Sequence, residues 1–182
     1  IAALPPIKRG EATGRSLAIA GIILSIIGLI VGAALWLLLA LSPDNTPVSG
    51  PAVTAKQRHT LQMIGALKDG ETIEMFCCSG MFSIREGGVL LTDGRLVIYG
   101  KGTQIQECRL AEVAEIDFTP AENWLGEGQF VLDLDDGRIF TFTVDGMDAG
   151  DKLFHRTLSG LVAEARKKAG KSVPTPGPEA ME

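Results

Sequence analysis

The residues best suited to chemistry are three cysteines and two histidines. Cys108 and His155 are a candidate nucleophile–base pair, in which the imidazole would accept the thiol proton. Cys77 and Cys78 are adjacent, and adjacent cysteines seldom form a disulfide with each other because their Cβ vectors diverge along a strand. No residue spacing indicates a third group that would orient the imidazole. The sequence therefore predicts buried structural thiols rather than an enzyme.

A second candidate for chemistry is a group of carboxylates, Asp133, Asp135 and Asp136, which resembles a set of cation ligands. They fall at a strand end and a turn, where a solvated acidic hairpin tip is the commoner arrangement. The chain has no CxxC or HExxH pattern, no P-loop, no G-x-S-x-G and no dinucleotide-binding fingerprint. The sequence thus predicts no metal site and no cofactor.

Charge is distributed unevenly along the chain. The net charge is −5 overall, but residues 60–169 contain eleven Lys and Arg against eighteen Asp and Glu, a net of −7. An acidic domain repels nucleic acid and anionic lipid head groups. Nucleic acid is therefore not an expected partner.

The apolar residues concentrate in residues 17–41, a run of 25 residues without a charge. As a helix this run is about 37 Å long, enough to cross a hydrocarbon core of about 30 Å. A cleaved signal peptide has a shorter apolar core, and no small-x-small cleavage pattern follows before Ser42. The run predicts a single transmembrane helix that holds the chain in the lipid bilayer.

Small residues recur within this run at Gly21, Ser25, Gly28 and Gly32. Spacings of four, three and four keep them on one helix face, and Gly28 with Gly32 forms a G-x-x-x-G pair. Small residues allow close approach of two helix backbones in lipid, so this face predicts docking, in a homo-oligomer or with membrane protein partners. The alternative is that glycine is simply common in membrane helices.

The remaining residues predict a mainly-β, α+β domain with flexible attachments. We expect a flexible segment over 1–16, a proline-rich linker over 42–54, a domain over 55–169 that opens with an amphipathic helix near 55–68, and a disordered tail over 170–182. Apolar alternation and two Asp-Gly turns predict about seven antiparallel strands, near 72–78, 89–91, 96–99, 103–108, 113–119, 130–134 and 138–144. Residues 148–168 then change to a helical period.

Two stretches of this domain resemble a known family. Residues 88–99 (GVLLTDGRLVIY) resemble the signature hairpin of bacterial pleckstrin-homology-like (PH-like) domains, and residues 109–116 (RLAEVAEI) are similar to a later strand of that family. The resemblance covers about residues 71–168. It implies a small barrel of about seven antiparallel strands closed by a C-terminal helix, and a role in protein binding or scaffolding.

Lipid-binding members of the wider superfamily use a basic pocket beside the first hairpin. Here that region contains Glu71, Glu74 and Glu86, with only Lys68 and Arg85 as bases. Phosphoinositide binding is therefore not expected.

A partner-binding candidate is the glycine-flanked loop that contains Trp124 and Leu125. Aromatic side chains dominate binding hot spots, so these two residues could anchor a partner protein. The alternative is that Trp124 folds back over the end of the barrel.

Together these features predict a membrane-anchored interaction or scaffold module, an accessory subunit that stabilises a larger membrane complex. The alternatives are a ligand or signal sensor, which requires a pocket at the barrel mouth, and a thiol enzyme, which requires a lowered thiol pKa. Lys8, Arg9 and Arg15 precede the apolar run and favour a cytoplasmic N-terminus with an extracytoplasmic domain. The three unpaired cysteines favour a reducing compartment instead.

Overall fold

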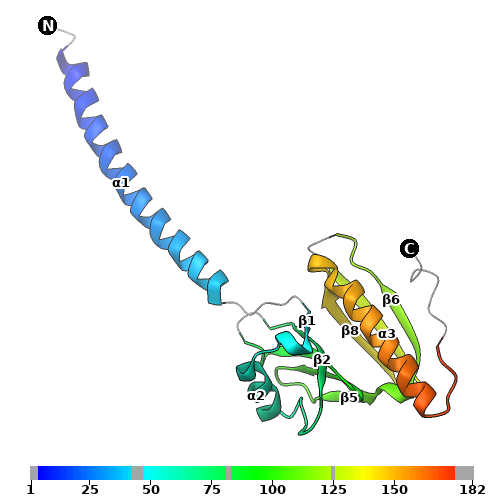
Figure 1. Cartoon of the computed structure of the whole chain (residues 1–182). Coiled ribbons are helices and arrows are strands. Elements are labelled where there is room, and N and C mark those ends of the chain that lie inside the picture. The colour runs from blue at the N-terminus through cyan, green and yellow to red at the C-terminus, as the bar shows by residue number, and fades with distance from the viewer. Residues whose placement is uncertain (1–3, 42–46, 81–82, 124–125, 175–182) are drawn as a thin grey trace. The chain divides into compact units, whose positions relative to one another are not determined.

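The computed structural model describes residues 4–41, 47–80, 83–123 and 126–174 (Figure 1). Within the first helix, side chains are described for residues 19–37. The chain divides into two compact units, Ile1–Ser42 and Pro43–Glu182, and each is considered by itself.

The first unit contains one long helix, α1 (Leu4–Leu41). Its backbone is already helical over residues 4–16, which differs from the flexible segment expected there. Pro5 and Pro6 fall in the first turn, where the backbone has no N–H partner to lose and the fixed φ of proline suits a helix.

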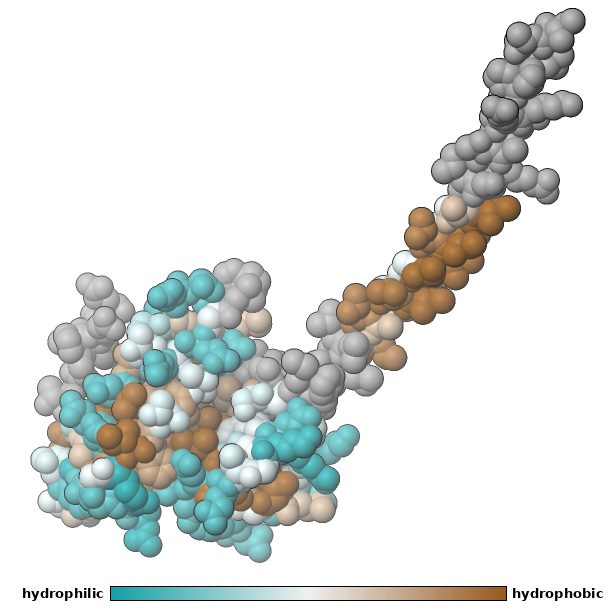
Figure 2. Space-filling model, turned by 180° about the vertical axis from the view of Figure 1, so that it is seen from behind, coloured by the Kyte–Doolittle hydropathy of each residue, from teal (hydrophilic) through white to brown (hydrophobic). Residues whose placement is uncertain are grey.

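The segment Ile19–Leu37 of α1 is long and apolar enough to cross a membrane, with a mean hydropathy of 2.5. None of it is buried within the structure. Figure 2 shows the surface of this segment as mostly hydrophobic. Among the described residues this is the one helix that meets the test, so the prediction of a candidate membrane-spanning helix near the N-terminus is confirmed by length and composition.

The described residues of the second unit form two antiparallel sheets and two α-helices, so the predicted α+β class is confirmed. The first sheet has the order β1-β2-β3-β4-β5, and the second has the order β6-β7-β8. The strands are β1 (Val48–Ser49), β2 (Ile73–Cys78), β3 (Gly87–Thr92), β4 (Arg95–Gly100), β5 (Gln106–Arg109), β6 (Val113–Thr119), β7 (Glu127–Leu134) and β8 (Ile139–Asp145). The helices are α2 (Ala55–Met63) and α3 (Gly150–Lys168), with short 3-10 turns η1 (Gly50–Ala52), η2 (Leu110–Glu112) and η3 (Met147–Ala149).

Strand β1 and turn η1 fall where the sequence predicted only a linker. Val48 is the register partner of Phe76 in β2, and the Arg58 guanidinium in α2 donates to the Gly50 carbonyl at 2.7 Å. A Cβ atom on Gly50 would lie 1.6 Å from the Ile73 carbonyl oxygen, so only glycine fits this approach. The described part of the segment 42–54 therefore belongs to the fold. A two-residue strand has no alternation for a sequence pattern to detect.

Helix α2 begins with a complete capping box. The Thr54 hydroxyl accepts from the Gln57 backbone, and the Gln57 side chain accepts from the Thr54 backbone. The helix ends at Met63, earlier than the predicted 68, and Gly65 then takes a positive φ of 78°.

Strands β2, β3 and β4 of the first sheet are buried on both faces, which explains why they show almost no alternation between apolar and polar residues. One face packs against the region of α2, with Phe76, Leu90 and Val97 among its buried residues. The register of β2 shifts between Ile73 and Met75, so Ile73 shares a face with Phe76 rather than with Met75.

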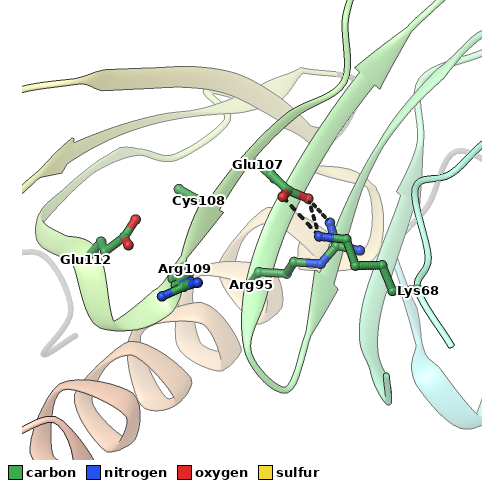
Figure 3. Close-up of a pocket in the computed structure, with 6 residues that line it drawn as sticks. All are labelled: Lys68, Arg95, Glu107, Cys108, Arg109 and Glu112. Atoms are coloured by element: carbon green, nitrogen blue, oxygen red, sulfur yellow. Dashed lines mark hydrogen bonds and ion pairs between the residues drawn. The ribbon is translucent and has the colours of Figure 1, made fainter. Parts of the chain in front are cut away.

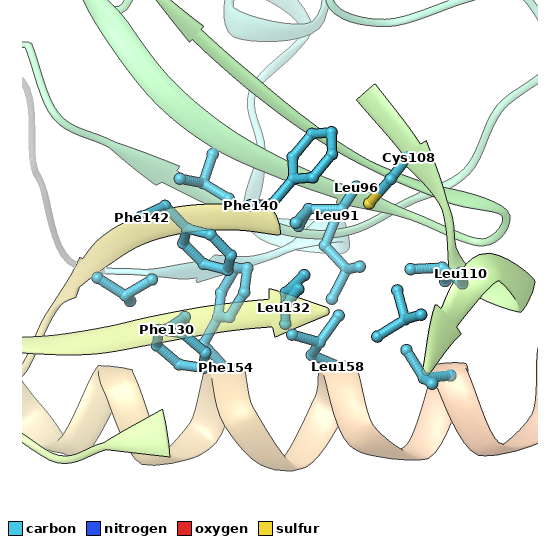
Figure 4. Close-up of a cluster of buried hydrophobic side chains, with 14 of the residues drawn as sticks. Leu91, Leu96, Cys108, Leu110, Phe130, Leu132, Phe140, Phe142, Phe154 and Leu158 are labelled. Carbon is cyan, nitrogen blue, oxygen red and sulfur yellow. The ribbon is translucent and has the colours of Figure 1, made fainter. Parts of the chain in front are cut away.

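The second sheet alternates, and its inner face joins α3 and the other face of the first sheet in one core (Figure 4). Phe130 stacks on Phe142 at a centroid distance of 4.9 Å and meets Phe154 of α3 edge-on at 5.6 Å. Turn η2 separates β5 from β6, and in the described residues the two sheets do not join into a closed barrel. The expected barrel of about seven strands is therefore replaced by sheets of five and three strands.

The C-terminal residues 171–174 also differ from the expected disorder. Arg166 in α3 donates to the Ser172 carbonyl at 2.5 Å, and Lys171 donates to the Asp135 carboxylate at 2.7 Å. The last turn of α3 thus holds the described start of the tail against the β7–β8 turn. Residues 175–182 lie outside the described part of the chain.

Candidate functional site

The predicted docking face of α1 is a stripe of four small residues: Gly21, Ser25, Gly28 and Gly32. At 100° per residue they fall within an arc of about 60° on the helix surface. A Cβ atom built at any of the three glycines would meet nothing within 4 Å. The Ser25 hydroxyl donates to the Gly21 carbonyl at 2.8 Å, so its polar group is satisfied inside the helix. The small-residue stripe is therefore a shallow surface without an unsatisfied hydroxyl, as close helix packing in lipid requires.

The predicted partner anchors, Trp124 and Leu125, lie outside the described residues. The residues on each side of them are held in place. The buried Asp151 carboxylate in the first turn of α3 accepts from the Ala121 backbone at 2.9 Å, and Gly146 donates to the Gly126 carbonyl at 2.9 Å. The loop therefore leaves the second sheet and returns to it at fixed points.

All three thiols are buried, and burial raises the pKa of Cys77 and of Cys108 to about 11. Burial also raises the pKa of Cys78. A thiol acts as a nucleophile only as its thiolate, so these environments oppose the thiol chemistry considered from the sequence.

The candidate base, His155, is half-buried and packs against an aromatic ring. Its ring stacks on Phe118 at a centroid distance of 4.5 Å, and burial lowers its pKa. Within the described part of the chain, no hydrogen bond joins Cys108 to His155. The residues therefore do not form the nucleophile–base pair that their types allowed.

We expect the folded chain to react slowly and without selectivity toward a maleimide at pH 7.5. The reason is that burial restricts access to Cys77, Cys78 and Cys108 and disfavours their thiolates. Mass spectrometry over time should show three labels only after denaturation. If one cysteine in the folded chain labels as fast as glutathione, the thiols are not all unreactive, and the hypothesis of a thiol enzyme returns.

Two of the three aspartates considered as cation ligands, Asp135 and Asp136, bind basic side chains of the chain itself. Asp135 accepts from Lys171 and from Arg166 at 3.0 Å, and these hydrogen bonds lower the pKa of its carboxyl. Asp136 binds Arg138 at 2.7 Å. No cluster of metal-ligating side chains occurs among the described residues.

A pocket of about 360 Å³ lies beside the edge strand β5 (Figure 3). Its lining consists of Lys68, Arg95, Glu107, Cys108, Arg109 and Glu112. Figure 3 shows Lys68 and Arg95 converging on Glu107. Both Lys68 contacts to this carboxylate measure 3.0 Å. The pocket is polar and lies at the surface, rather than at the mouth of a barrel.

The buried Arg95 side chain forms one wall of this pocket and uses most of its donors internally. Its Nε and Nη2 atoms bind both oxygens of Glu71 at 2.5 and 2.7 Å, and Nη1 binds Glu107. Nη2 also donates to the Ala66 carbonyl at 3.0 Å. The hydrogen bond from Arg95 is the main reason that the pKa of Glu71 is lowered. Two of the pocket's cations are thus committed to carboxylates, which leaves this pocket a poor candidate for a sensor site.

Comparisons with known proteins give no family for this chain. No protein-family model matches it, and no curated protein matches it significantly.

Proposed function

We propose that this chain is a membrane-anchored interaction module, an accessory subunit that stabilises a larger membrane protein complex. In this account α1 crosses the bilayer and docks laterally through the small-residue stripe, while the second unit binds a protein partner. Trp124 and Leu125 remain the first candidates for the partner-binding residues. The observation that carries the proposal is the open stripe on an apolar helix of which no part is buried over Ile19–Leu37.

The size and surface of α1 support the anchor. Nineteen residues of helix rise about 28 Å, close to the thickness of a hydrocarbon core. The exposed side chains are apolar all round, with Ile22, Leu24 and Leu29 each more than half exposed. A helix that is apolar on every side is unstable in water and suits lipid.

The second unit supports binding rather than catalysis. Its cysteines are buried with raised pKa values, and its most buried charged groups, Arg95, Asp151 and Arg166, hold segments of its own chain together. These groups therefore act in folding and leave the exposed surface and loops for partners.

For the fold of this unit we propose a PH-like relationship, although the sheets remain open. The order of the elements supports it, since the β2–β5 meander, the β6–β8 meander and the closing helix α3 follow in the expected sequence. Residues 88–99, which gave the resemblance, lie in the β3–β4 hairpin. For the side of the membrane we propose an extracytoplasmic second unit, on the charges that precede the apolar run.

Substituting Gly28 and Gly32 by leucine is expected to separate the chain from its helix partner. Two leucine side chains would fill the space through which the backbones approach, and van der Waals packing is the main attraction between helices in lipid. Extraction in a mild detergent, followed by size-exclusion chromatography with light scattering, should give an assembly for the natural chain and a monomer for the double variant.

The matched control is Ala33→Leu with Ala34→Leu, two small-to-large changes outside the stripe, about 110° and 150° from its centre around the helix axis. This variant should elute with the natural chain, because its leucines leave the stripe open. Equal loss of assembly in both double variants would show that the stripe is not the docking face. An unchanged assembly in the glycine variant would have the same consequence.

A further inference from the structure

The strands of the second sheet contain five carboxylates and no lysine or arginine. These carboxylates lie at Glu115, Asp117, Glu127, Asp133 and Asp145. They alternate with the buried residues of each strand, so they occupy the face that points away from the core. Register places Glu115 opposite Asp133 and Glu127 opposite Asp145. One side of the second sheet is therefore strongly acidic.

Helix α3 covers the other side of this sheet, and its solvent-facing surface has the opposite charge. Lys152, Arg156 and Lys167 are exposed, and within the described residues none of them makes an ion pair. At 100° per residue they fall within an arc of about 60°, and they extend over about 22 Å of helix. We call these three residues the basic face of α3.

Two side chains beside the basic face, those of Lys168 and Leu153, leave its positive charge in place. Lys168 is exposed but binds Glu164 at 2.9 Å, so that pair adds little net charge. Leu153 is 49% exposed and adds an apolar side chain near the first two cations. Gly160, at the middle of the helix, is exposed and has open space around it.

The chain enters the second unit beside this same helix. Pro47, the first described residue after α1, lies against Gly150 at the start of α3, where a Cβ atom on Gly150 would be 2.5 Å from the Pro47 ring. Only residues 42–46 separate the end of α1 from Pro47. Six Cα–Cα steps span at most about 20 Å. The covalent connection between α1 and Pro47 is therefore short.

We propose that the basic face of α3 lies on the anionic head groups of the bilayer that α1 crosses. The positive charge of the basic face favours anionic head groups as its partner. The short connection between α1 and Pro47 allows the face to reach them. This inference rests on the proposed function, because it requires α1 to be in a membrane. The acidic face of the second sheet then points away from the lipid.

Segregation of charge is what permits this arrangement in a domain that is acidic overall. Each basic residue near an anionic surface adds roughly a five-fold factor to the association constant, and the attraction decays over a Debye length. The carboxylates of the second sheet lie on the far side of the core, and their repulsion from the surface favours the same orientation. Tethering supplies a high effective concentration of lipid, so weak contacts are sufficient.

The test uses the full chain in vesicles with one reporter cysteine at a time. Gly160→Cys places a fluorophore on the basic face of α3, and Thr141→Cys places the same fluorophore on the exposed face of β8. The natural cysteines are buried, so labelling selects the new one. Quenching by a nitroxide on the lipid head group then measures how close each position lies to the surface, in phosphatidylcholine with or without one third phosphatidylglycerol.

We expect strong quenching at position 160 in anionic vesicles, weak quenching at position 141, and loss of the difference in neutral vesicles or at 1 M salt. Lys152→Gln, Arg156→Gln and Lys167→Gln should each lower the bound fraction, with about a five-fold change in the association constant. Unchanged circular dichroism would show that these variants remain folded. Lys101→Gln, an exposed lysine outside α3, is the matched control and should have no effect.

Equal quenching at both positions, or no dependence on anionic lipid, would overturn the inference. Protection of position 160 in native membranes but not in protein-free vesicles would overturn it in favour of an acidic protein partner. A chain that is washed from the vesicles at alkaline pH would instead show that the anchor itself has failed. The two failures are therefore distinguishable.

Discussion

A chain with Ile27→Arg and Ile30→Arg is expected to leave the membrane. Both residues lie near the middle of the apolar segment and are more than half exposed. An arginine at the centre of a membrane helix costs about 2.5–3.5 kcal/mol, so the pair costs about 5–7 kcal/mol. After an alkaline carbonate wash, the natural chain should remain in the membrane pellet and the variant should appear in the supernatant.

The control for this prediction is Ile27→Leu with Ile30→Leu, which keeps the segment apolar and should remain in the pellet. Neither substitution touches the small-residue stripe. If the arginine variant also resists the wash, α1 is not held by the hydrocarbon core. The proposal that α1 anchors the chain in the bilayer would then be wrong.

Replacing Arg95 by methionine is expected to destabilise the second unit by about 2–4 kcal/mol, because removing one partner of a buried ion pair leaves the other without compensation. The guanidinium is buried and links β4 to Glu71, to Glu107 and to the Ala66 carbonyl. Urea denaturation of the full chain in mild detergent, followed by circular dichroism, gives the change in the free energy of unfolding.

Arg109→Met is the matched control, since Arg109 is exposed, is the register partner of Arg95 in β5, and makes no ion pair among the described residues. It should cost less than about 0.5 kcal/mol. Equal costs for the two variants would mean that Arg95 has no special structural role.

Acid provides a second readout of the Arg95 contacts. In the folded chain the pKa of Glu71 is lower than its ordinary value of 4.5. Its contribution to stability is therefore fully present above pH 4.5 and is lost as the pH falls through the lowered pKa. In Arg95→Met this part of the acid sensitivity should be smaller than in the natural chain.

Local patterns predicted the elements that are half exposed. Strands β6, β7 and β8 alternate residue by residue, and α3 has one apolar stripe, so their types and approximate bounds followed from the sequence. Strands β2, β3 and β4 are buried on both faces, so alternation did not locate them, and the Asp93-Gly94 turn marked the β3–β4 hairpin instead. Strand β1 was missed because pairing with β2 alone defines it.

The stripe on α1 could be predicted because a single helix has one period and needs no tertiary information. The groups that organise the second unit could not. Arg95 meets Glu71 across 24 positions in the chain, Asp151 meets Ala121 across 30, and Arg166 meets Val113 across 53. No local spacing encodes such contacts.

Composition predicted the charge of the second unit but not its distribution. A net of −7 over residues 60–169 argued against any attraction to anionic lipid. The fold places the carboxylates of β6–β8 and the cations of α3 on opposite sides of one sheet. A sum over the sequence loses this separation, because it depends on which face of each element is buried.

Native mass spectrometry after gentle detergent extraction tests most directly whether this chain is, as we propose, an accessory subunit of a membrane complex. The account predicts at least one foreign subunit in fixed stoichiometry with this chain, and loss of that subunit in the Gly28→Leu, Gly32→Leu variant. A chain that runs alone, as a monomer or as a homodimer, would contradict the accessory role.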